Sequence, residues 1–260
     1  NQTVNLPITL AAGAHVISTA GGAGTLVMTN SVTRNHGAEV QFGVSGGTIS
    51  STLGLNNGII GGWAVYSPST SLINNAGGAG AVDWAVTNSS GTLTAYSGDT
   101  TVSGSGQTIA NNPSSNVKIA SNGSSGDTVG SGTTTINTLI WSATTQNGYI
   151  NIPASSTLRL GAQGAILHND NKYLRIGNGQ SGSAVTAGGA DNVAGELCVY
   201  NLSYYAADAV EFWTTLTDNG SGPVTMTAFG SVKIDNANTY SGVTYINACD
   251  FYCNGGVNTP

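Results

Sequence analysis

The stretch Asn236-Ala-Asn-Thr-Tyr-Ser-Gly-Val-Thr-Tyr-Ile-Asn247 decides how the rest of the chain is interpreted. A run typical of a β-strand, Ser231-Val-Lys-Ile-Asp235, precedes it, and a second such run extends from Val243 to Ala248. A polar turn that contains Tyr240 and a Ser-Gly step lies between the two runs. Strand, turn and strand within about twenty residues is the size of one coil of a β-solenoid.

The composition favours ordered β structure over a flexible linker. The chain has 260 residues, of which 7% are charged, far below the roughly 25% usual in soluble domains. Glycine accounts for 38 residues, yet 39% of the chain is hydrophobic, much of it Val, Ile and Leu in short alternating runs. Disordered chains lack this material for a buried face, so we expect one large all-β domain or a stack of repeats.

The charge balance excludes several classes of partner. The formal net charge is −6, from 12 acidic residues and only 6 Lys plus Arg. Such a chain has no basic patch for nucleic acid or for anionic lipid. No apolar run reaches the roughly 18 residues of a membrane-spanning helix, and the first residues, NQTVNLPITL, lack the features of a signal peptide.

Several passages occur in the order found in one known family. The segment NANTYSGVTYINA, residues 236–248, resembles the signature of the autotransporter-associated β-strand repeats of large bacterial surface proteins. Further passages resemble units of the same family, namely Asn57-Gly-Ile-Ile-Gly-Gly-Trp63-Ala64, Asp83-Trp-Ala85, TINTL at 135–139, STLRLGAQGAIL at 156–167, ELCVYN at 196–201 and LTDNG at 216–220. The strand VTMTAFGSVKI at 224–234 and the Cys-Asp-Phe-Tyr-Cys sequence at 249–253 depart from the family pattern.

Pattern and resemblance together predict an all-β fold, a right-handed parallel β-helix with about a dozen coils and little or no helix. We expect a single domain over residues 1–260, with looser coils at 100–135 and the signature repeat at 231–256. Residues 206–215 are the one passage with some helical periodicity. The alternation of Val210, Phe212 and Thr214 favours a strand there, with a short helical turn as the alternative.

Three cysteines, Cys198, Cys249 and Cys253, leave several pairings open. On a single strand, Cys249 and Cys253 would lie about 13 Å apart, too far for a disulfide. A turn at Asp250 would be needed to join them. The alternatives are small buried residues of the core, a disulfide between Cys249 and Cys253, or a disulfide that includes Cys198. No ligand spacing supports a zinc site.

The search for catalytic chemistry finds few candidates. Polysaccharide-cleaving β-helices need paired carboxylates or acidic metal ligands beside a basic residue. The densest candidates are the cluster from His168 to Arg175, the pair Asp208 and Glu211, and the pair Asp191 and Glu196. We interpret all three as solvated loops or local ion pairs. No Gly-x-Ser-x-Gly elbow or phosphate-binding loop occurs, and calcium-binding repeats are absent. The sequence therefore predicts no enzyme, no cofactor and no metal site.

Two tryptophans, Trp63 and Trp84, admit two interpretations. In a chain with 7% aromatic residues they are weak candidates for contact with carbohydrate. The favoured interpretation is that they supply buried area where the core is thin.

The family resemblance implies an extracellular or cell-surface location in a bacterium and a structural or adhesive role. The expected partners are further copies of the chain, adjacent repeats of a longer chain, or surface polysaccharide. If the protein assembles end to end, the segment with Phe251 and Tyr252 is the expected joint. The alternatives are a carbohydrate-binding or carbohydrate-cleaving β-helix that uses Trp63, Trp84 or the 168–175 cluster, and a phage-type fibre.

Overall fold

The computed structural model describes residues 1–68, 82–121, 125–142, 147–169, 172–203, 209–247 and 250–253. These residues form an all-β structure of 25 strands, without any helix. It follows that no helix of the described chain could cross a membrane. The chain divides into two compact units, one ending at Gly98 and the other beginning at Asp99.

The first unit is built on a six-stranded sheet with the order β1-β3-β5-β6-β7-β8, beside the parallel pair β2-β4. The strands from β1 to β6 pair in parallel, whereas β6-β7 and β7-β8 are antiparallel. The bounds are β1 Gln2–Val4, β2 Ile8–Leu10, β3 Gly13–Met28, β4 Val32–Arg34, β5 Ala38–Ser51, β6 Ala64–Ser67, β7 Asp83–Thr87 and β8 Leu93–Ala95.

Strand β3 is longer than the sequence suggests. The glycine-rich step after Ala20 predicts two short strands, but β3 pairs with β5 from Gly13 to Met28. The register shifts between Ala20 and Gly24, where Gly21 and Gly22 have φ of 64° and 77°. A side chain would be strained in this conformation, so the glycines let the strand bend without ending.

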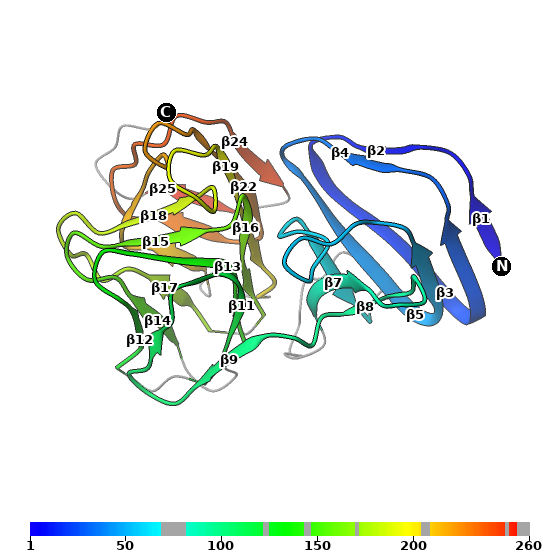
Figure 1. Ribbon diagram of the computed structural model, residues 1–260, viewed down its shortest axis with the longest axis horizontal. Helices are drawn as coiled ribbons and strands as arrows, with labels where there is room; N and C mark the ends of the chain where they lie inside the picture. Colours follow the sequence, from blue (N-terminus) through cyan, green and yellow to red (C-terminus); the bar gives the residue numbers. More distant parts are fainter. Residues whose placement is uncertain are drawn as a thin grey trace. The chain divides into compact units, whose positions relative to one another are not determined.

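The second unit contains long ladders of parallel strands (Figure 1). A seven-stranded sheet has the order β10-β12-β14-β17-β20-β23-β25, and a ten-stranded sheet joins the rows β9-β11-β13-β16-β19-β22-β24 and β13-β15-β18-β21. The bounds are β9 Thr100–Ser103, β10 Thr108–Ile109, β11 Asn112–Ser121, β12 Asp127–Val129, β13 Thr133–Trp141, β14 Gly148–Asn151, β15 Thr157–Leu160, β16 Gln163–His168, β17 Leu174–Ile176, β18 Ala184–Ala187, β19 Gly195–Asn201, β20 Val210–Phe212, β21 Thr215–Leu216, β22 Val224–Phe229, β23 Val232–Ile234, β24 Thr244–Asn247 and β25 Phe251–Cys253.

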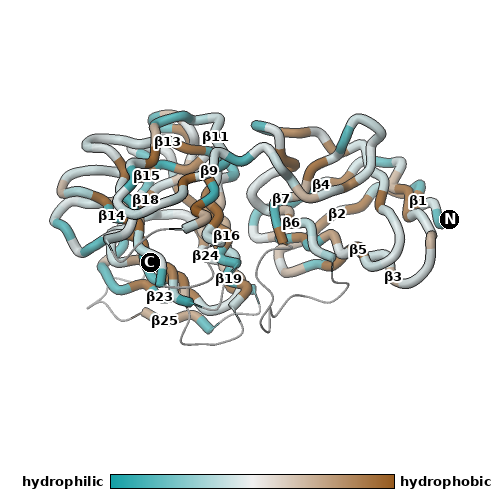
Figure 2. The backbone as a smooth tube through the Cα atoms, turned by 90° about the horizontal axis from the view of Figure 1, so that it is seen from below, coloured by the Kyte–Doolittle hydropathy of each residue, from teal (hydrophilic) through white to brown (hydrophobic). Residues whose placement is uncertain are grey.

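The core of the second unit consists of apolar side chains stacked in register from strand to strand. Ile150, Ile176, Phe212 and Ile234 form one such row in the seven-stranded sheet, and each is at most 2% exposed. Burial of a side chain of this size contributes about 1.5–3 kcal/mol to folding. Figure 2 shows hydrophobic stretches along β16 and β19 of the ten-stranded sheet, whose inward residues belong to the same cluster. Strand-to-strand stacking of like residues therefore builds one continuous core.

Paired strands are separated by varied lengths of chain. Lys233 and Glu211, on neighbouring strands, are 22 residues apart, whereas Arg175 and Glu211 are 36 apart. The first spacing agrees with the about twenty residues per coil that the signature stretch indicates, and the second is much longer. The longer interval includes β18 and β19, which belong to the ten-stranded sheet.

The signature stretch binds its neighbours through side chains at the turn and through the backbone at the strand. Tyr240 is buried in the core, and its hydroxyl group shares a hydrogen bond of 2.7 Å with Oγ1 of Thr244. The Oδ1 atom of Asn238 accepts a hydrogen bond from the backbone N–H of Leu216 at 2.8 Å, in place of a strand partner. β24 then pairs with β22 from Thr244 onward.

The Ser-Gly step of the signature is explained by close backbone contact. The backbone N–H and the hydroxyl of Ser241 both donate to the carboxylate of Asp218, at 2.9 and 2.7 Å. A Cβ atom at Gly242 would lie 2.2 Å from the carbonyl oxygen of Val224. Only glycine permits this approach without displacing the backbone.

Candidate functional site

An outward-facing row of polar and aromatic side chains crosses the seven-stranded sheet. Strand register aligns Tyr149, Arg175, Glu211, Lys233 and Tyr252 on β14, β17, β20, β23 and β25. Apolar residues beside them on β14, β17, β20 and β23 belong to the core, and Phe251 on β25 packs against it. Successive side chains of a strand point to opposite faces, so the five residues face outward. We call these five residues the outward row.

The centre of the outward row is a chain of ion pairs. Arg175 donates from Nε and Nη2 to Oε2 of Glu211, at 3.0 and 2.9 Å. Lys233 Nζ lies 3.4 Å from Oε1 of the same carboxylate and 3.2 Å from Oδ2 of Asp235. The Glu211 side chain is only 10% exposed, so these contacts are stronger than those of a fully solvated pair. Two positive and two negative charges therefore neutralise one another.

Three aromatic rings surround the guanidinium group of Arg175. Its Cζ atom lies 3.5 Å from the ring centroid of Trp213, 5.0 Å from that of Tyr173 and 5.7 Å from that of Tyr149. The two tyrosine rings meet edge to face with centroids 5.8 Å apart, and their hydroxyl groups are hydrogen-bonded to each other. Each cation–ring contact of this kind contributes about 0.5–2 kcal/mol. All three residues are partly exposed.

The environment fixes the protonation of two groups in this region. Partial burial and the hydrogen bond with Tyr149 raise the pKa of Tyr173, with Arg175 opposing, so its hydroxyl group stays protonated at neutral pH. Burial alone would lower the pKa of Lys233. The hydrogen bond with Asp235 and the charges of Glu211 and Asp235 outweigh burial and raise this pKa. Lys233 is therefore a cation under ordinary conditions.

The structure separates the residues of the 168–175 cluster. Arg175 joins Glu211 on the outward row, whereas His168 is fully buried at the end of β16 and donates from Nδ1 to Asn201 Oδ1 at 2.8 Å. Burial lowers the pKa of His168 to about 4, against the opposing hydrogen bonds with Asn201 and the backbone of Lys172. Asp170 lies outside the described residues.

The two acidic pairs singled out in the sequence have different surroundings. Asp191 forms an ion pair with Arg159, and the aspartate side chain is 79% exposed. Glu196 is buried on β19 and accepts a hydrogen bond of 2.6 Å from the hydroxyl group of Thr227. Glu211 belongs to the outward row, and its sequence neighbour Asp208 lies outside the described residues.

Both tryptophans of the first unit are buried. Trp63 is 6% exposed and lies beneath the guanidinium group of Arg34, with 5.5 Å between Cζ and the ring centroid. Trp84, on β7, has no exposed surface. Neither indole presents a ring face to solvent.

The segment that ends at β25 combines exposed apolar and aromatic side chains. Phe251 packs partly against the core, Tyr252 is 44% exposed, and Cys253 is exposed. Cys249 lies outside the described residues, so a disulfide between Cys249 and Cys253 stays one of the open alternatives. Cys198 is buried on β19. On β24, Ile246 is 52% exposed although it pairs with the core residue Ala228.

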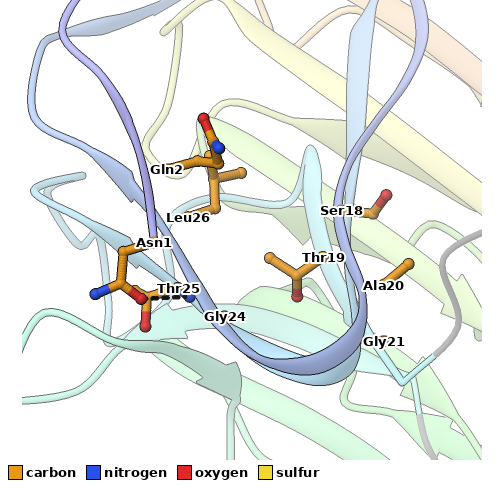
Figure 3. Close-up of a pocket in the computed structure, with 9 residues that line it drawn as sticks. All are labelled: Asn1, Gln2, Ser18, Thr19, Ala20, Gly21, Gly24, Thr25 and Leu26. Atoms are coloured by element: carbon orange, nitrogen blue, oxygen red, sulfur yellow. Dashed lines mark hydrogen bonds between the residues drawn. The ribbon is translucent and has the colours of Figure 1, made fainter.

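A small pocket of about 240 Å³ lies in the first unit, beside the bend of β3 (Figure 3). Asn1 and Thr25 face Thr19 across it, and Asn1 Oδ1 accepts a hydrogen bond from the backbone N–H of Thr25 at 3.2 Å. The side chains that line it are uncharged. Its volume falls below the range usual for organic ligands.

Within the described ranges, no three His, Cys, Asp or Glu residues are grouped so as to hold a metal ion. Comparisons with protein-family models, with curated proteins and with solved structures found no match.

The sequence interpretation did not predict the outward row, although the sequence contains a pattern that indicates it. The short strands Leu174-Arg-Ile176, Val210-Glu-Phe212 and Val232-Lys-Ile234 each place a charged residue between two apolar ones.

Proposed function

We propose that this chain is a structural, adhesive segment of an extracellular bacterial surface protein, related to the autotransporter-associated β-strand repeats. In this proposal the strands wind as a right-handed parallel β-helix, and the whole chain contributes about a dozen coils. The long parallel ladders of the second unit support it, because parallel strands joined by crossover connections wind almost always in the right-handed sense. The family assignment rests on the motifs and their order, since no family model matches.

The observation that carries the proposal is the exposure of Ile246. This residue continues the row of Leu139, Ile166, Val199 and Ala228, all of which are buried. It is nevertheless 52% exposed, and Val243 beside it is 58% exposed. An inward position that remains open to solvent is the natural place for one more parallel strand to pair. We infer that another copy of the chain, or a further repeat of a longer chain, covers it.

The experiment that tests the proposal measures assembly of the purified chain by sedimentation velocity over a range of concentrations and by electron microscopy. We expect concentration-dependent growth into filaments with a regular axial repeat. Ile246→Asp should abolish this growth because it places a charge on the uncovered row. Leu55→Asp is the matched control, since Leu55 is 47% exposed in the first unit and should leave assembly intact.

Particles that remain monodisperse monomers at every concentration would refute assembly between copies. A discrete trimer would instead favour the phage-type fibre, because a closed three-fold complex does not grow. Equal assembly of the Ile246→Asp variant would show that growth occurs elsewhere on the surface.

A further inference from the structure

The outward row and the aromatic rings beside it form a surface that differs from the rest of the chain in chemistry. Only 7% of residues are aromatic and 7% are charged, yet three rings and four charged groups meet around Arg175 and Glu211. Tyr149, Tyr173 and Trp213 are partly exposed residues whose rings lie around the outward-facing Arg175. Exposed aromatic surface rimmed by hydrogen-bonding groups is a feature of binding sites.

Unused hydrogen-bonding capacity remains at the centre of this surface. Among the described residues, Arg175 donates through Nε and Nη2, which leaves the protons of its other terminal nitrogen available. The ammonium group of Lys233 has three donors for its two carboxylate partners. Groups of this kind suit a ligand rich in hydroxyl oxygens.

The charges select against an anionic ligand. Arg175 and Lys233 are already matched by Glu211 and Asp235, so these four groups together carry no net charge. The whole chain carries a formal net charge of −6, which repels a polyanion at long range. A neutral ligand meets neither obstacle.

The extent of the surface indicates an elongated ligand. Tyr252, 44% exposed, lies on the same row as Tyr149 and four strand-to-strand steps away. At about 4.8 Å per step this separation is about 19 Å. Aromatic rings thus stand at both ends of a polar strip, and the carbon-bound hydrogens on one face of a sugar ring pack well on such rings.

We propose that the face of the seven-stranded sheet from β14 to β25 binds a neutral polysaccharide that lies across the strands. Tyr149, Tyr173 and Tyr252 would contact sugar-ring faces, while Arg175 and Lys233 would donate to hydroxyl oxygens. The binding uses the outward face of the sheet, whereas end-to-end assembly uses the open row at Ile246 on β24. Because Tyr252 lies in the segment that the sequence also indicates as the joint, Tyr149→Ala and Ile246→Asp are the two variants that separate the proposals.

The test is affinity electrophoresis of the purified chain in gels that contain dextran, galactomannan or xyloglucan, with polygalacturonate as the acidic probe. Retardation by at least one neutral polysaccharide is expected, with none by polygalacturonate. Tyr252→Ala should weaken binding about tenfold, as expected for the loss of one aromatic contact. Tyr149→Ala should do the same. Tyr96→Ala, a partly exposed tyrosine of the first unit, is the matched control and should bind like the unaltered chain.

Circular dichroism of each variant establishes that it is folded. If Tyr149→Ala disturbs the sheet, the Tyr252→Ala variant decides, because Tyr252 is the more exposed of the two residues. Absence of retardation in all three neutral gels would overturn the proposal. So would retardation by polygalacturonate alone, or binding that survives both substitutions unchanged.

Discussion

Acidification should destabilise the second unit through His168. Burial lowers the pKa of this residue from 6.5 to about 4 in the folded protein. Above pH 6.5 the imidazole is neutral in both folded and unfolded chains, and the full stability is present. Between pH 6.5 and about 4 only the unfolded chain binds the proton, so stability falls as the pH falls. Below about 4 both states bind it and the loss is complete.

The expected loss follows from the difference between the two pKa values. At 1.36 kcal/mol per pH unit, the interval between 6.5 and about 4 corresponds to about 3 kcal/mol. That is a large part of the stability of an ordinary domain, for which 5–15 kcal/mol is typical. The hydrogen bond to Asn201 Oδ1 opposes the loss, because it favours the protonated ring.

The assay is urea-induced unfolding followed by circular dichroism at several pH values between about 7.5 and 4. The informative quantity is the difference between the unaltered chain and a His168→Gln variant, because it isolates the contribution of this one side chain. That variant should be less stable at neutral pH, yet should lose less stability on acidification. His15→Gln, in the first unit, serves as the control and should keep the full pH dependence. Parallel stability curves for the unaltered chain and His168→Gln would refute the reasoning.

Three substitutions test the packing of the second unit. Gly242→Ala should lower the free energy of unfolding by about 2 kcal/mol, because the new Cβ would lie 2.2 Å from a carbonyl oxygen. Gly54→Ala is the control: its Cβ meets open space, so the free energy of unfolding should change by less than about 0.5 kcal/mol. Glu211→Gln should lower the free energy of unfolding by about 2 kcal/mol at low salt and by less at about 1 M salt. Urea titrations that show unchanged stability would contradict the role of the ion pairs. Ile176→Ala should cost about 3 kcal/mol by the same measurement, and a loss below about 1 kcal/mol would show that its row is loosely packed.

The strands of the second unit were largely accessible to sequence reasoning. Alternating apolar residues predicted strands at 157–160 and 164–167, and the structure has β15 at Thr157–Leu160 and β16 at Gln163–His168. The alternation of Val210 and Phe212 likewise predicted β20 rather than a helical turn. These predictions succeeded because inward residues must be apolar wherever strands stack on a shared core.

The candidate site was not accessible in the same way. Arg175 and Glu211 are 36 residues apart, and no sequence pattern between them indicates that they lie opposite each other on neighbouring strands. The connections between strands vary in length, so sequence distance does not predict which residues become neighbours. The same difficulty separated His168 from Arg175, which are close in sequence but belong to different sheets. In the first unit, the antiparallel pairing of β7 with β6 and β8 also follows no local signal.

The parallel pairing of the second unit has a mechanical consequence. The hydrogen bonds of the seven-stranded sheet run from one strand to the next, so a pull that separates β10 from β25 loads them in series. The weakest junction would then open first, and the strands would peel away in turn without resisting as one block. A pull along the strands would instead load many hydrogen bonds at once and shear them together. The same sheet is thus compliant along one direction and stiff along the other, a difference that a single-molecule force measurement with two attachment geometries would resolve.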